Sequence, residues 1–242
     1  MRRTTEQRNK IRVALVLLLL MLNGLTVAVE VSWTGGVYPQ NGVDVEHLSG
    51  SVVLLAEIEN VNFTGLPDDE YEDGTCQFEY NWYVNGVLTS EHTDTITLAN
   101  KQNNIQGQGV YNVRCEARCH LTTPKQDDGN DLWTDWKFVG QHNVTFFTLE
   151  FQRQDGTPVN SIKIAECGAE NLNAVVTPNC SPVIILTKSS SNITAFYQIP
   201  GLVTIGSNEL GAYGLFAQYR GRTIVTLAVN VLEAYVQLTI VP

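Results

Sequence analysis

The chain has 242 residues, a formal net charge of −10, 43% hydrophobic residues and 17% charged residues. This length suits one large or two ordinary domains, and the composition excludes a disordered or fibrous protein. A chain this acidic repels phosphate backbones, so we expect no nucleic-acid partner.

Residues 1–28 have the layout of a secretory signal peptide. Five basic residues precede an apolar run over residues 13–22, and small residues precede a cleavage site after Ala28. The alternative is an uncleaved signal anchor, in which residues 13–29 are retained in a membrane, although this stretch of about 17 residues is short for a span. Either outcome predicts an exported protein, extracellular or held at the cell surface.

The rest of the sequence predicts β-strands throughout. Short apolar or alternating runs are separated by Gly, Asn, Asp and Pro, and no segment has the pattern of a long amphipathic helix. This spacing predicts an all-β fold of two tandem β-sandwich domains, over residues 29–145 and 146–242. In the first domain we expect strands over residues 52–58, 76–84, 93–98 and 109–117. Asn85-Gly86 ends the second of these as a hairpin turn.

The second domain is predicted from strand pattern alone. Eight runs have the length and alternation of strands. They cover residues 146–151, 161–167, 173–177, 183–188, 193–199, 213–219, 223–231 and 234–241.

Two motifs of the first domain resemble a known family. The sequence Trp-Tyr-Val-Asn-Gly at 82–86, followed by Gly-Val-Tyr-Asn-Val at 109–113, is similar to core strands of immunoglobulin-like and polycystic-kidney-disease-type (PKD) domains of exported and cell-surface proteins. Residues 76–119 carry the resemblance, whereas the second domain only loosely resembles bacterial immunoglobulin-like domains. The PKD signature Trp-Asp-Phe-Gly-Asp-Gly is absent, and the spacing from Cys76 to Trp82 is too short for an antibody-type domain. The resemblance implies immunoglobulin-like sandwiches and leaves function open.

The five cysteines all follow the signal segment, where export permits disulfides. The resemblance implies that segments 76–84 and 109–119 pair as the antiparallel strands C and F, whose opposed residue numbers have a constant sum near 194. Cys76 with Cys119 gives 195 and Cys76 with Cys115 gives 191, so we predict Cys76–Cys119 and a buried free Cys115. Cys167 and Cys180 remain, and we predict that they form a second disulfide. A zinc site at Cys115 and Cys119 lacks two further ligands.

No catalytic set is recognisable, so we predict that the protein is not an enzyme. The histidines are scattered, and the sequence has no nucleophile elbow and no phosphate-binding loop. An acidic loop offers oxygen ligands for calcium, and its alternative interpretations are a solvated loop tip and a glycosidase carboxylate pair. No other cofactor is predicted. The calcium candidates are Asp68, Asp69, Glu70, Glu72 and Asp73, and a second acidic loop covers residues 127–131.

Trp133 is the predicted binding residue. If residues 132–139 form one strand, Trp136 and Phe138 share its core face and Trp133 points the other way. An exposed Trp can stack on a sugar or on a partner's side chain, and the alternative is that it covers the domain joint.

These features leave three functions open. The first is an adhesion or interaction module with a protein or glycan partner at a cell surface. The second is a carbohydrate-binding or carbohydrate-active protein that uses Trp133 and the acidic loops. The third is a structural subunit of an envelope or surface assembly.

Overall fold

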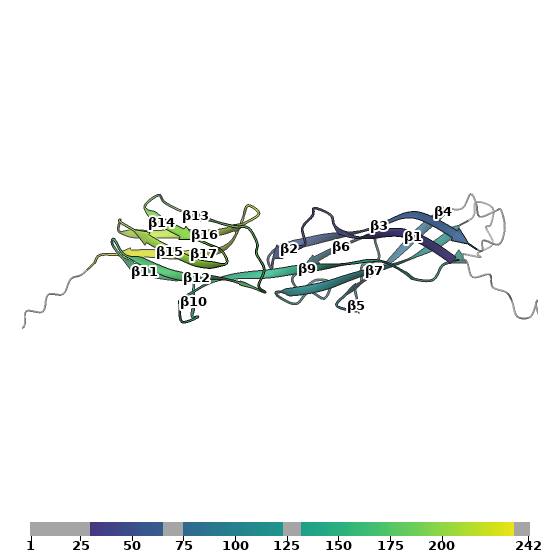
Figure 1. Cartoon of the computed structure of the whole chain (residues 1–242), viewed down its shortest axis with the longest axis horizontal. Helices are drawn as coiled ribbons and strands as arrows, with labels where there is room; N and C mark the ends of the chain where they lie inside the picture. Colours follow the sequence, from purple (N-terminus) through teal and green to yellow (C-terminus); the bar gives the residue numbers. More distant parts are fainter. Residues whose placement is uncertain (1–29, 65–74, 123–131, 235–242) are drawn as a thin grey trace, which may run out of the picture. The chain divides into compact units, whose positions relative to one another are not determined.

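The computed structural model describes residues 30–64, 75–122 and 132–234, and the regular structure there is all β-strand (Figure 1). The predicted all-β fold is therefore confirmed. None of the described residues forms a helix with the length and apolarity needed to cross a membrane. The predicted signal segment 1–28, the calcium candidates at 68–73, the second acidic loop at 127–131 and residues 235–241 of the last predicted strand lie outside the described residues.

The strands that precede residue 153 form two sheets with an immunoglobulin-like order. One sheet has the order β1-β3-β6, and β4, β7 and β9 are neighbours in the other, with β5 beside β4 and β2 beside β9. In chain order, β1, β3 and β6 therefore hold the A, B and E positions of the fold, and β4, β7 and β9 hold the C, F and G positions. The bounds are β1 Glu30–Pro39, β2 Val45–His47, β3 Ser51–Thr64, β4 Thr75–Val84, β5 Val87–Leu88, β6 Thr95–Ala99, β7 Gly109–Thr122, β8 Leu132–Trp133 and β9 Lys137–Gln152.

Two side chains in this part are hallmarks of the immunoglobulin-like fold. Trp82 on β4 is fully buried, and its indole N–H donates to the carbonyl of Thr93 at 2.8 Å. The hydroxyl of Tyr111 on β7 donates to the carbonyl of Gly107 at 2.8 Å and accepts the backbone N–H of Gln106 at 3.1 Å. A buried Trp on strand C and a tyrosine corner at the start of strand F characterise this fold.

The later part of β9 and the strands that follow it repeat the pattern, with four strands in each of two sheets. The order β9-β12-β15-β14 gives the A, B, E and D positions, and β13-β16-β17 gives C, F and G, with β11 parallel to β17. Buried side chains from both sheets form one core that includes Phe151, Leu172 and Leu215. The bounds are β10 Pro158–Val159, β11 Ser161–Ala165, β12 Ala169–Thr177, β13 Ile184–Lys188, β14 Ile193–Tyr197, β15 Gly201–Ser207, β16 Gly211–Tyr219 and β17 Arg222–Leu232.

The chain divides into two compact units. The smaller comprises Met1–Gly35, Ile58–Glu79 and Ala117–Phe138, and the larger comprises Gly36–Glu57, Tyr80–Glu116 and Val139–Pro242, as far as these ranges are described. Strand β9 runs without a break through residues 145 and 146, and its residues 148–152 pair with β12. The domain boundary between residues 145 and 146 stays a prediction.

Candidate functional site

The predicted disulfide between Cys76 and Cys119 is present and fixes the neighbouring ends of β4 and β7. The two Cα atoms are 5.7 Å apart. Thr134 holds the segment after β8 against the same point. Its hydroxyl accepts the backbone N–H of Cys119 at 2.9 Å, and its own N–H donates to the Cys119 carbonyl at 3.0 Å. Two hydrogen bonds therefore hold the end of β8 against β7, which the disulfide joins to β4.

Trp133 is the last residue of β8, and two side chains of β7, His120 and Arg118, contact its ring. It pairs with His120 across the β7–β8 ladder, and the two rings stack with centroids 4.2 Å apart at 11°. Arg118 projects from the same face of β7 as His120, because side chains two residues apart share a face. Its guanidinium carbon is 4.1 Å from the centre of the Trp133 ring and 4.7 Å from that of Trp136.

Glu79 on β4 orients the arginine. Its Oε2 atom accepts the Nε–H of Arg118 at 2.9 Å and an Nη2–H at 2.7 Å. The Glu79 and Arg118 side chains are 45% and 32% exposed, so the pair contributes only about 0–1 kcal/mol in free energy of unfolding. Its main effect is to hold the guanidinium plane over the indoles. We call Glu79, Arg118, His120, Trp133 and Trp136 the Trp133 cluster.

The smaller unit gathers three of the four tryptophans in the chain, and none of the three is fully buried. Trp33 lies edge-on to Phe78 with centroids 5.7 Å apart, and its indole N–H donates to the carbonyl of Phe138 at 3.3 Å. Trp133 is 40% exposed and Phe138 is 51% exposed. Exposed aromatic area of this kind is concentrated at binding surfaces.

The prediction that Phe138 faces the core is wrong. Residues 132–139 do not form one strand, since β8 ends at Trp133 and β9 begins at Lys137. Because the strand is interrupted between Trp133 and Lys137, the alternation of inward and outward side chains does not continue across it. Thr134 is therefore buried and Phe138 is exposed.

The predicted disulfide between Cys167 and Cys180 does not form, and both thiols are free. The nine residues of β12, Ala169–Thr177, lie between them as an extended strand about 30 Å long. The two cysteines therefore flank opposite ends of one strand. Cys115 is fully buried as a free thiol, and burial raises its pKa to about 12.

The calcium ligands predicted at Asp68, Asp69, Glu70, Glu72 and Asp73 lie outside the described residues. Within the described ranges, no group of three or more His, Cys, Asp and Glu side chains is arranged to hold a metal ion. Calcium binding stays a prediction from the sequence.

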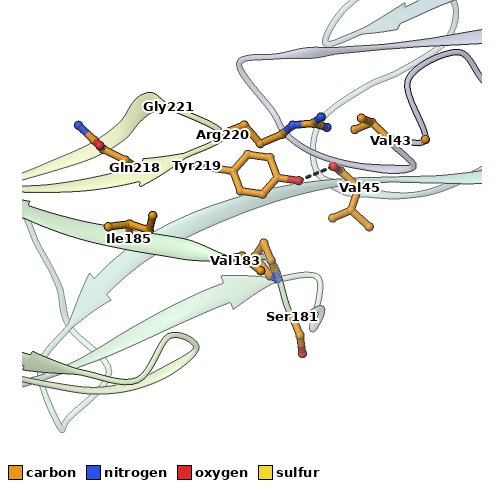
Figure 2. Close-up of a pocket in the computed structure, with 11 residues that line it drawn as sticks. Val43, Val45, Ser181, Val183, Ile185, Gln218, Tyr219, Arg220 and Gly221 are labelled. Atoms are coloured by element: carbon orange, nitrogen blue, oxygen red, sulfur yellow. Dashed lines mark hydrogen bonds between the residues drawn. The ribbon is translucent and has the colours of Figure 1, made fainter.

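The larger unit contains a mainly apolar cavity of about 600 Å³ that no sequence motif indicated (Figure 2). Three segments far apart in the chain line it, so no local pattern could have revealed it. The hydroxyl of Tyr219 donates to the carbonyl of Val45 at 2.7 Å at its edge. The lining residues are Gly42, Val43, Val45, Ser181, Pro182, Val183, Ile185, Gln218, Tyr219, Arg220 and Gly221.

These observations define the class of protein. The strand order, the buried Trp82 and the Tyr111 corner make this chain an immunoglobulin-like β-sandwich protein. No protein-family model and no curated protein matches the sequence.

Solved structures of other multidomain proteins match this chain over most of its length. Domains 4 and 5 of the S-layer protein SbsC are 12% identical, with 84% of this chain and 99% of that chain covered and a TM-score of 0.29. Three N-terminal domains of the outer capsid protein Hoc of bacteriophage RB49 are 14% identical, with 86% and 71% covered and a TM-score of 0.34. The insect immune protein hemolin is 15% identical, with 83% and 47% covered and a TM-score of 0.29. The fold assignment rests on the strand order and hallmark residues above.

Proposed function

We propose that this chain is an exported, non-catalytic interaction module that binds a protein partner through the Trp133 cluster. The observation that carries the proposal is a 40% exposed Trp133 held in place by Arg118 and His120. Trp and Arg are the residue types most enriched at the centres of protein interfaces. A preoriented indole also loses little conformational freedom on binding, which lowers the entropic cost of association.

The ring environment favours a protein partner over a glycan. A sugar stacks on the open face of an indole, and here the His120 ring and the Arg118 guanidinium already lie within 4.2 Å of the Trp133 ring centre. These neighbours compete with a sugar for the ring. The exposed rim of Trp133 and the exposed Phe138 offer the kind of apolar anchors that fill pockets on a protein surface.

The test measures binding of the labelled protein, without residues 1–28, to the envelope fraction of the cells that produce it. Trp133→Ala is expected to weaken binding about 30-fold, since a hot-spot Trp contributes roughly 2 kcal/mol or more. Arg118→Lys keeps the charge but loses the planar guanidinium, so a smaller loss is expected. Phe196→Ala removes an exposed aromatic from the larger unit and serves as the matched control.

Treatment of the envelope fraction separates the partner classes. Binding that is lost after protease and kept after periodate oxidation of glycans supports a protein partner. Binding that is lost only after periodate would replace the proposal with carbohydrate binding through the same cluster. Equal binding by the wild type and Trp133→Ala would overturn both.

A further inference from the structure

Strand β13 has an open edge. Among the described residues, β13 is hydrogen-bonded in its sheet to β16 alone. The backbone N–H of Ser189 donates to the carbonyl of Gly214, directly opposite in the same register. Because hydrogen-bonded and non-hydrogen-bonded pairs alternate along an antiparallel ladder, residues 184, 186 and 188 direct their N–H and C=O groups to the free edge.

The apolar surface beside this edge lies on the outer face of the sheet. Ile184 and Leu186 point into the core and are only 7% and 8% exposed. The inner face of β13 is therefore already buried and offers no apolar surface to a partner. Val183 and Ile185 point outward and are 80% and 55% exposed. They line the 600 Å³ cavity with Val43 and Val45 (Figure 2). We call this cavity the Val183–Ile185 groove. An open backbone edge beside an apolar groove is the arrangement that accepts an added strand.

Residues 234–241 of the chain have the sequence that such a groove accepts. The segment Ala-Tyr-Val-Gln-Leu-Thr-Ile-Val alternates, with Val236, Leu238 and Ile240 on one face and Tyr235, Gln237 and Thr239 on the other. It has no charged residue, no Gly and no Pro, although the chain as a whole carries −10. Its docking on a second acidic copy therefore adds no like-charge contact.

The segment cannot lie along β13 of its own copy. Through β16, Ile184 is level with Arg222 at the start of β17, whereas the segment follows Leu232 at the end of β17. Ten residues of strand separate these levels by about 33 Å. Lys188, at the near end of β13, is level with Leu227, which is still about 17 Å along the sheet from Leu232, so most of the segment would be used in reaching the strand. Two strands, β16 and β17, also separate Leu232 from the free edge of β13. We therefore expect residues 234–241 to pair along the length of β13 only on another molecule.

The nearer open edge within the same copy is less suitable. Strand β11 lies beside β17, but its exposed side chains are Ser161, Lys163 and Ala165. A short edge strand with a lysine and no apolar surface is protected against strand addition. The Val183–Ile185 groove offers the apolar contacts that β11 lacks.

We infer that residues 234–241 of one copy add as a strand to the β13 edge of a second copy, with Val236, Leu238 and Ile240 in the Val183–Ile185 groove. The donor segment and the acceptor edge are different surfaces, so the contact is heterologous and repeats from copy to copy. The product is an open, head-to-tail chain of molecules. This inference is independent of the partner proposed for the Trp133 cluster.

Two double variants of the chain without residues 1–28 test the inference. The donor variant Leu238→Lys/Ile240→Lys places charge on the apolar face, and Gln237→Lys/Thr239→Lys adds the same charge to the opposite face as its control. The acceptor variant Val183→Lys/Ile185→Lys charges the groove, and Phe196→Lys is its control at another exposed apolar position. Sedimentation velocity is measured over a range of concentrations.

The wild type and both controls are expected to form oligomers that grow with concentration, and each double variant alone is expected to stay monomeric. An equimolar mixture of the two double variants is the decisive sample. One variant keeps a working acceptor and the other keeps a working donor, so the mixture is expected to form a dimer and nothing larger. This recovery also shows that both variants are folded. A monomeric wild type, or a mixture that stays monomeric, would overturn the inference.

Discussion

Glu46 is a buried carboxylate that the sequence gives no reason to expect. It is 5% exposed on β2, where its Oε1 atom accepts a hydrogen bond from Arg222 and the backbone N–H of His47 at 2.9 Å. His47 itself is 9% exposed, and its Nδ1 atom accepts the backbone N–H of Ser49 at 3.2 Å. That bond requires an unprotonated Nδ1, so the structure accommodates the neutral imidazole.

The stability of the protein is predicted to fall in mild acid because of His47. Burial, followed by the charge of Arg222, lowers the pKa of His47 below its ordinary 6.5. Between the lowered folded-state pKa and 6.5 the unfolded state binds more protons than the folded state, so the free energy of unfolding decreases as pH falls through this window. Urea unfolding between pH 5 and 8 measures the effect. His47→Gln is expected to remove this part of the pH dependence, and an unchanged slope in the variant would contradict the assignment.

The three free thiols are predicted to differ in reactivity. Cys167 is exposed, burial raises the pKa of Cys180, and complete burial raises the pKa of Cys115 to about 12. Because the thiolate is the reactive form, at pH 8 Ellman's reagent is expected to modify Cys167 rapidly, Cys180 slowly and Cys115 only after denaturation. Cys167→Ser should remove the fast phase alone. Native-state labelling of Cys115 would contradict the burial that the structure gives it.

At the scale of single elements, Gly140 on β9 marks a close approach of two backbones. A Cβ atom at this position would lie 2.6 Å from the backbone nitrogen of Val37 and 2.9 Å from the Cα of Gly36 on β1. Both are backbone atoms, which cannot rotate away as a side chain can. Glycine is therefore required for the approach of β9 to β1.

Gly140→Ala is predicted to lower the free energy of unfolding by about 2–4 kcal/mol, since one of the strands must shift. Gly109→Ala on β7 is the control, because its Cβ would meet Tyr111 at an ordinary 3.5 Å. The control should change stability by less than about 1 kcal/mol. Urea unfolding of both variants makes the comparison, and equal losses would show that the Gly140 contact is relieved without strain.

The elements that sequence analysis could locate are those with local signals. Alternation around Trp82 predicted β4. The resemblance to immunoglobulin-like domains implied that this segment pairs antiparallel with residues 109–119, and the constant sum of paired residue numbers then predicted Cys76–Cys119. The prediction of a Cys167–Cys180 disulfide is wrong because it paired the two remaining cysteines without regard to the strand between them. Only the tertiary structure shows the full length of that strand.

The surroundings of Trp133 and the groove required long-range information. Arg118 and His120 contact Trp133 only because β8 pairs with β7, although residues 123–131 separate the two strands in the sequence. The lining of the groove combines residues near 43, 183 and 219, and no periodicity in the sequence relates these segments. Both features follow from strand pairing, which one sequence without its fold does not specify.

At the scale of the whole molecule, strand β9 pairs with strands that lie on both sides of residue 145 in the sequence. Its residues 145–147 pair with β2, and residues 148–152 pair with β12. Within the larger unit, Tyr219 on β16 also donates to Val45 on β2, and Arg222 on β17 pairs with the buried Glu46. These links predict that strands on both sides of residue 145 unfold together, whereas a domain boundary at this residue predicts two separate transitions.

Leu215→Ala distinguishes these outcomes. Leu215 is fully buried in the core formed by β9 and β11–β17, so its truncation is expected to lower the free energy of unfolding by about 2–5 kcal/mol.

The four tryptophans all precede residue 137, so tryptophan fluorescence reports only on the earlier strands, and Trp82 is the buried reporter within the larger unit. Cooperative unfolding requires the variant to shift the urea midpoint of tryptophan fluorescence as much as that of far-ultraviolet circular dichroism. Thr226→Ala, at an exposed position on β17, should shift neither. A fluorescence midpoint that stays at the wild-type value in Leu215→Ala would instead support two domains that unfold independently, divided near residue 145.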